Sequence, residues 1–97
     1  MKSFKLRLFV TGMSVQSQRA IANLTRICES DLAGLYEIEV IDVLEHPEQA
    51  ESAKILATPT LVKQLPEPVR KIIGDLSDRD KVLVGLDIER LAEGRLQ

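Results

Sequence analysis

One proline between two threonines divides the apolar middle of this 97-residue chain. Thr58-Pro59-Thr60 is followed at once by Leu61-Val62, which predicts a short strand. Proline has no backbone N–H, so it fits most easily at the start of a strand or on the edge of a sheet. A cis peptide bond at Pro59 is an alternative, but trans is the commoner isomer. We therefore expect a trans proline that opens an edge strand.

The length predicts one domain over residues 1–97. Apolar residues make up 44% of the chain but include only three aromatic residues, so the core must be built from aliphatic side chains. The net charge of −2 gives no support for nucleic-acid binding. We find no signal peptide and no apolar run of membrane length. The sequence therefore predicts a cytoplasmic protein that binds neither nucleic acid nor a membrane.

The single cysteine, Cys28, excludes an intramolecular disulfide, a Cys-x-x-Cys redox pair and a cysteine-based zinc cluster. Cys28 lies among Ile21, Leu24 and Ile27 at helical spacing, which predicts a buried, inert thiol. The single histidine, His46, has no second histidine with which to share a metal. We expect no catalytic residue, no metal and no cofactor.

Hydrophobic periodicity predicts strand, helix and strand over the first half of the chain. Residues 4–10 alternate as a half-buried strand, and residues 15 to about 32 have helical spacing with Ser14 as the N-cap. Residues 37–43 alternate again and predict a second, largely buried strand. Strands joined in this way should be parallel, with a right-handed crossover. A short helix opening at 46–48 and continuing within 49–55 should follow, with Pro47 in its first turn.

The last third of the chain carries two periodicities at once. Residues 69–76 fit a helix, but the proline-rich turn before them and Gly74-Asp75 near their end also fit a hairpin strand. Residues 82–88 alternate as a strand would and equally fit a helix that begins near Asp78 and Asp80. Gly85 would lie inside that helix, at a cost of roughly 1 kcal/mol relative to alanine. Both alternatives stay open.

Several long stretches resemble the KaiB family: residues 36–44 with Val40-Ile41-Asp42-Val43-Leu44 at their centre, and residues 54–61, 68–77 and 81–87. The resemblance implies an α/β, thioredoxin-like fold and no enzymatic activity. It also implies a regulatory protein that binds the ring of the ATPase KaiC and opposes KaiC phosphorylation. Family members adopt two folds: a ground-state tetramer with a different second half, and a thioredoxin-like monomer that binds KaiC. The segments with two periodicities are those that the family rearranges.

The resemblance also implies roles for single residues. Arg19, Lys54, Arg70 and Lys71 match basic positions that face the KaiC ring in the family. Lys71 stands where relatives often have arginine, so a bidentate contact there would become a point charge. The positions that bias the equilibrium between the two folds correspond to Gly85 and Asp87. The resemblance and the helix propensity together predict that Gly85→Ala favours the thioredoxin-like monomer.

Two features depart from the family pattern. Glu37 and Glu39 stand where members with a KaiA partner tend to have alanine and lysine, so a KaiA-type partner is in doubt. The residues 92–97 lack the strongly acidic tail of many relatives. Both features are consistent with a reduced or non-circadian Kai system.

Two other functions compete with this interpretation. A thioredoxin-like oxidoreductase would explain Pro59, because that proline lies beside the active site in thioredoxins. The redox cysteines would belong in the turn after the first strand, where this chain has Thr11-Gly12-Met13-Ser14, and disulfide exchange needs a thiolate. The other alternative is a free-standing paralogue of the KaiB-like sensor domain of a histidine kinase.

Overall fold

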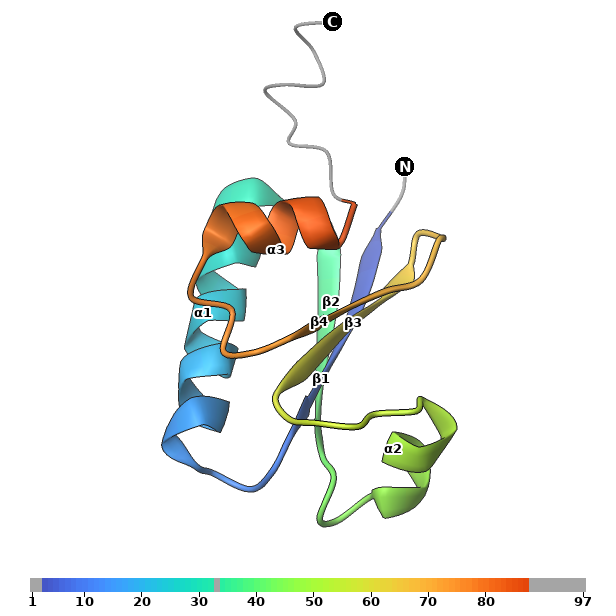
Figure 1. Ribbon diagram of the computed structural model, residues 1–97. Helices are drawn as coiled ribbons and strands as arrows, with labels where there is room; N and C mark the ends of the chain where they lie inside the picture. The colour runs from blue at the N-terminus through green and yellow to red at the C-terminus, as the bar shows by residue number, and fades with distance from the viewer. Residues whose placement is uncertain (1–2, 33, 88–97) are drawn as a thin grey trace, which may run out of the picture.

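The computed structural model describes residues 3–32 and 34–87, and these residues form one four-stranded sheet with helices on both faces (Figure 1). The strand order is β2-β1-β3-β4. The elements are, in chain order, β1 (Phe4–Val10), α1 (Val15–Asp31), β2 (Tyr36–Asp42), α2 (Pro47–Ser52), β3 (Thr60–Leu65), β4 (Arg70–Ile73) and α3 (Arg79–Gly85). No helix within these residues is both long enough and apolar enough to span a membrane.

The first half is the expected β-α-β unit, with β1 and β2 parallel in a register that pairs Phe4 with Tyr36 and Val10 with Asp42. Ser14 caps α1, since its side chain accepts a hydrogen bond from the backbone N–H of Ser17 at 3.1 Å. One prediction about this unit is wrong: β2 is not largely buried, because Ile41 is its only buried residue and the other six are half-buried or exposed. The reason is topological, because β2 lies at the edge of the sheet and its outer side has no neighbouring strand in the described residues.

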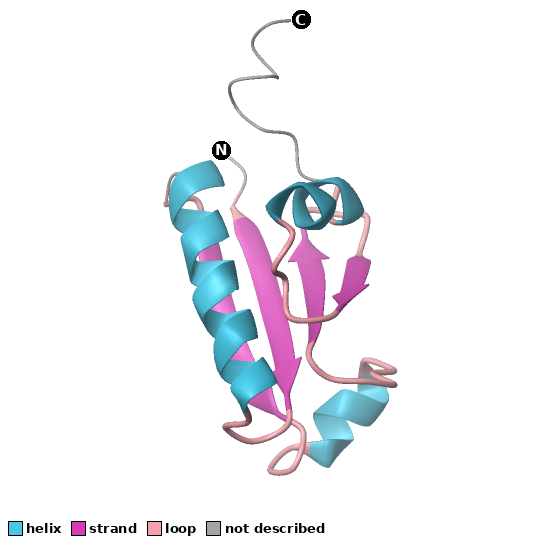
Figure 2. Cartoon of the chain, turned by 60° about the vertical axis from the view of Figure 1, so that its left-hand side comes forward, coloured by secondary structure: helices cyan, strands magenta, loops and turns pink. Residues whose placement is uncertain are grey.

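Alternate residues of each strand face two separate hydrophobic clusters. The larger cluster packs α1 and α3 against one face of the sheet, with Leu8, Leu24 and Val82 among its buried members. The smaller cluster, Phe9, Ile41 and Val62, lies under α2 and the residues beside it on the other face. Figure 2 shows that α2 covers only one end of that face. Phe9 is fully buried there, as expected for a strand covered on both sides.

The expectation for Pro59 is wrong in two respects. The Thr58–Pro59 bond is cis, and the strand that follows, β3, lies in the interior of the sheet between β1 and β4. The trans preference of an X–Pro bond is only about 0.5–1 kcal/mol, so tertiary contacts decide the isomer. Pro59 precedes the first residue of β3, so its missing N–H is not needed by the ladder, and its carbonyl accepts a hydrogen bond from the N–H of Gly74 at 2.9 Å.

The last third of the described chain has the thioredoxin-like arrangement. Residues 70–73 form β4, antiparallel to β3, and residues 79–85 form α3 with Asp78 as its N-cap. Ile72 of β4 packs against the larger cluster, to which α3 contributes Val82 and Leu83. Gly85 is the last residue of α3 rather than an interior one, because Asp87 adopts a left-handed conformation (φ 59°) that cannot continue a helix. The expected continuation to residue 88 lies outside the described residues.

Candidate partner-binding surface

Three loops meet at the carboxyl end of β1 and form an open, largely apolar surface. The turn after β1 is joined to the segment before Pro59 by a 2.5 Å hydrogen bond between the hydroxyls of Thr11 and Thr58. The carboxylate of Asp42, which ends β2, accepts the backbone N–H of Gly12 at 3.1 Å. Exposed apolar side chains come from all three loops or the residues next to them: Met13, Val15, Leu44 and Leu56.

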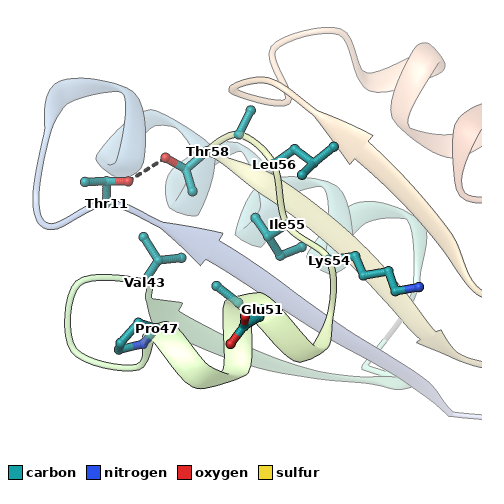
Figure 3. Close-up of a pocket in the computed structure, with 10 residues that line it drawn as sticks. Thr11, Val43, Pro47, Glu51, Lys54, Ile55, Leu56 and Thr58 are labelled. Atoms are coloured by element: carbon teal, nitrogen blue, oxygen red, sulfur yellow. Dashed lines mark hydrogen bonds between the residues drawn. The ribbon is translucent and has the colours of Figure 1, made fainter.

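A groove of about 860 Å³ runs between α2 and these loops (Figure 3). Its floor and walls are mostly apolar, with Val43 and Ile55 beside the smaller cluster and Leu56, which is 95% exposed, on its rim. Glu51 and Lys54 supply opposite charges along the same groove. The surface can therefore accept an apolar side chain of a partner while offering charged groups beside it.

The structure brings Lys54 and Lys71 together. The ammonium group of Lys71 donates a 2.6 Å hydrogen bond to the carbonyl of Ala53, and it lies 3.5 Å from the carbonyl of Lys54. Lys71 thereby ties β4 to the end of α2. Lys54 itself has a left-handed backbone (φ 58°) and an exposed side chain. These two lysines, which are joined through the Lys71 ammonium and the backbone of residues 53 and 54, form a basic corner beside the groove.

Arg19 and Arg70 do not belong to that corner. Arg19 is exposed on α1, which packs on the opposite face of the sheet from α2. Arg70 is paired with Lys63 across β3 and β4. Because residues alternate between faces along a strand, Arg70 shares the α3 side with Ile72 and Lys71 points to the α2 side. The four basic positions thus lie on both faces of the molecule.

The thiol chemistry of a thioredoxin is absent from the described residues. The turn after β1 holds Thr11, Gly12 and Met13, and Cys28 is fully buried on the inner side of α1. Burial, with smaller contributions from Asp31 and Glu29, raises the pKa of the Cys28 thiol to about 12. A thiol with that pKa supplies almost no thiolate at neutral pH. Nor do three or more potential ligands from His, Cys, Asp and Glu gather at a metal site within these residues.

The two carboxylates of β2 differ in their surroundings. Glu39 lies 3.4 Å from the guanidinium of Arg7, which also donates a 2.7 Å hydrogen bond to Gln49 of α2 and lies over the ring of Phe9. Glu37 forms no ion pair within residues 3–32 and 34–87 and is exposed. Sequence reasoning missed this network, although the alternation of Arg7 and Phe9 along β1 places them on one face. Of these two carboxylates, Glu39 is therefore the one whose charge is offset by Arg7.

Gly85 and Asp87 lie together at the end of α3. A Cβ atom added to Gly85 would be 2.7 Å from Cδ1 and 3.1 Å from Cγ1 of Ile72 on β4. Asp87 is in a left-handed conformation, which glycine and asparagine adopt more easily than aspartate. Gly85 therefore reports on the contact between α3 and β4, and Asp87 on the way in which α3 ends.

Comparison with known proteins places this geometry in a family. The family model described as the KaiB domain matches residues 7–88. The circadian clock protein KaiB3 of Synechocystis is 59% identical, over 91% of this chain and 86% of the relative. The circadian clock oscillator protein KaiB of Acaryochloris marina is 53% identical, over 99% of this chain and 94% of the relative.

Solved structures agree on the fold. The N-terminal domain of SasA from Synechococcus elongatus matches with a TM-score of 0.74 and 26% identity, over 90% of this chain and 86% of that one. Mitochondrial thioredoxin 3 of Saccharomyces cerevisiae matches with a TM-score of 0.70 and 19% identity, over 90% and 79% of the two chains, which shows the fold alone. The chain therefore belongs to the KaiB family, and its described residues have a thioredoxin-like fold.

Proposed function

We propose that this protein is a non-enzymatic regulator that binds the ring of a KaiC-type ATPase and opposes its phosphorylation, as part of a Kai timing or stress system. The main support is a combination of two likenesses. In sequence the chain is 53–59% identical to clock proteins of the KaiB family, and in structure it matches the N-terminal domain of SasA. The described chain thus has the thioredoxin-like arrangement that, in the family, binds KaiC.

The binding surface that we propose combines the apolar groove with the basic corner of Lys54 and Lys71. An apolar side chain of the ATPase would fill the groove beside Leu56, and acidic groups next to it would approach the two ammonium groups. Charge complementarity of this kind raises the rate and the specificity of association. Arg19 and Arg70 would contact the ring only if the partner extends past the sheet edge, because they lie outside this corner.

Charge-reversal variants test the proposed surface. We expect Lys54→Glu and Lys71→Glu to weaken capture of the chain by a nucleotide-loaded KaiC-type ATPase at least tenfold. Arg19→Glu and Arg70→Glu should weaken it less. Lys81→Glu is a matched control, since Lys81 is an exposed lysine of α3, on the opposite face of the sheet from the groove. Equal capture of all five variants and the wild type would show that these cations are ordinary surface charges.

The variant Lys54→Gly tests the charge of Lys54 separately from its backbone conformation. Because Lys54 has φ 58°, glycine fits this conformation better than lysine and should preserve the loop while removing the ammonium group. We expect this variant to keep its stability against denaturant and to lose affinity for the ATPase. Unchanged affinity would remove Lys54 from the proposed surface.

The regulatory part of the proposal has its own measurement. A KaiC-type ATPase incubated with ATP should reach a lower phosphorylated fraction when this chain is present, and Lys54→Glu should restore the fraction seen without it. A phosphorylated fraction that does not respond to the chain would contradict the proposed antagonism, even if the two proteins bind.

A further inference from the structure

A partly buried ion pair joins Asp31, the last residue of α1, to Arg79, the first residue of α3, whose side chain is half exposed. The carboxylate of Asp31, whose side chain is only 5% exposed, accepts hydrogen bonds from two nitrogens of Arg79. The Nε–Oδ2 distance is 2.7 Å and the Nη2–Oδ1 distance is 2.5 Å. The hydroxyl of Ser30 donates a further hydrogen bond to Asp31 at 3.0 Å. Such a bidentate contact is geometrically specific as well as charged.

Each member of this pair lies at the wrong end of its own helix. Asp31 is at the carboxyl end of α1, where the helix dipole disfavours a negative charge, and α1 has no basic residue in its last turn. Arg79 opens α3, where the dipole disfavours a positive charge. Neither charge helps the helix that carries it. Across the contact between the two helices, the two opposite charges face each other.

A second polar contact connects the same two parts of the chain. The side-chain amide of Asn23, on α1, donates a 2.9 Å hydrogen bond to the carbonyl of Asp75. Asp75 belongs to the segment between β4 and α3, and Leu76 next to it is buried in the larger cluster with a left-handed backbone (φ 65°). Two side chains of α1 therefore hold the stretch that leads into α3, from residue 75 to residue 79.

We propose that the Asp31–Arg79 pair is a latch that holds α3 on α1 and thereby sets how much of the protein has the arrangement described above. An ion pair of this kind adds little net stability compared with apolar packing, but breaking it takes the guanidinium of Arg79 away from the buried carboxylate of Asp31, and a buried charge that loses an opposite charge is costly. The pair therefore raises the free energy of arrangements in which α3 leaves α1. This effect is larger than its contribution to the stability of the whole fold. The unit of β1, α1 and β2 precedes α3 in the sequence. We expect this unit to remain folded when the latch opens.

The link from latch to partner rests on the proposed function. If the arrangement with α3 in place is the one that binds the ATPase, the apparent affinity falls in proportion to the fraction of chains in that arrangement. The latch would then regulate binding from a position that does not touch the groove or the basic corner. Variants of Asp31 should change affinity without altering either surface.

Amide hydrogen exchange of the isolated chain tests the latch without any partner. In Asp31→Asn we expect the α3 amides, for example those of Val82 and Leu86, to exchange at least about tenfold faster, while the amide of Leu8 in β1 changes little. Glu29→Gln is the matched control, because it makes the same change at an exposed position of α1. Arg79→Lys, which keeps the charge but not the bidentate geometry, should give a smaller effect in the same direction.

Two results would overturn the latch. In one, the α3 amides of Asp31→Asn and of Arg79→Lys exchange as slowly as in the wild type. In the other, the amides of α3 and β1 accelerate equally, so that the pair contributes only to global stability. Arg79→Lys decides the outcome if Asp31→Asn does not fold, because Arg79 is half exposed. Failure of the wild type to bind any KaiC-type ATPase would contradict the proposed function instead, since the exchange experiment does not use the ATPase.

Discussion

At the residue scale, Gly85 is governed by two opposing effects. Alanine is the better helix former by roughly 1 kcal/mol in a helix interior, and by less at the last residue of α3. The added methyl group, however, would lie 2.7 Å from the end of the Ile72 side chain, so that side chain must move. Overpacking of this kind costs about 1–3 kcal/mol when the neighbour cannot adjust. Ile72 is only half-buried and so has room to rotate.

A shorter side chain at position 72 should reveal how much Gly85→Ala contributes to stability when the clash is removed. We expect Gly85→Ala to stabilise the described arrangement more in an Ile72→Val background, which lacks the nearest methyl group, than in the wild type. The difference should be about 1 kcal/mol by chemical denaturation. The same free-energy change in both backgrounds would mean that Ile72 does not restrict this position.

Asp87 gives a second test at the same end of α3. Its left-handed conformation is one that glycine adopts without steric cost, so Asp87→Gly should stabilise the described arrangement by about 0.5–1 kcal/mol. The α3 amides should then exchange more slowly than in the wild type. Faster exchange of these amides in Asp87→Gly would show that the aspartate side chain contributes more than its backbone costs.

At the element scale, α1 carries both the latch and the only cysteine. The pKa of Cys28 is raised to about 12 by burial, so the folded thiol stays protonated where the unfolded one, with its ordinary value near 9, ionises. The unfolded state therefore binds fewer protons than the folded state between pH 9 and 12. Over that range the contribution of Cys28 to stability is lost as pH rises, and it is fully present below pH 9.

Thiol labelling tests this burial directly. At pH 8 the thiolate fraction expected from these pKa values is roughly a thousandfold smaller in the folded chain than in the unfolded one. We expect iodoacetamide to react with the native protein correspondingly slowly, and rapidly once denaturant is added. Comparable rates in both conditions would show that the inner side of α1 is open to solvent.

The elements also differ in how far sequence predicts them. Residues 4–42 could be assigned because period-2 and period-3.6 patterns are unmixed there and Ser14 marks the helix start. The exposure of β2 could not, because an edge position depends on the strand order and not on the strand's own residues. Residues 69–88 fit both periods, and their choice of strand and helix depends on contacts of Ile72 and Val82 with a distant part of the chain.

The candidate surface shows the same division. Lys54 and Lys71 were predicted as partner-facing residues from family resemblance, and their position as partner contacts stays a prediction. Their proximity could not be predicted, because it depends on the pairing of β4 with β3. The groove and the Asp31–Arg79 pair were missed for the same reason, since each joins segments that are far apart in sequence. One local signal in the sequence could have indicated the pair: Asp31 and Arg79 each carry a charge that opposes the dipole of their own helix.

At the scale of the whole molecule, the sheet separates two kinds of contact. On one face α1 and α3 enclose the larger cluster, and the latch closes its edge. On the other face α2 covers only the end of the sheet where the three loops meet (Figure 2). The proposed partner surface is thus at that end, while the groups that hold α3 in place are on the opposite face. This arrangement allows the fold population and the contact surface to be altered by different substitutions.

The most direct measurement of this account is hydrogen exchange of the chain with and without a nucleotide-loaded KaiC-type ATPase ring. We expect new protection at residues 11–14, the turn beside the groove, and at residues 53–58, which form one wall of the groove and the basic corner. We also predict slow exchange throughout α3 in the bound chain, as expected if the described arrangement is the one that binds. An exchange pattern that the ATPase leaves unchanged, or protection confined to regions away from these loops, would contradict this account.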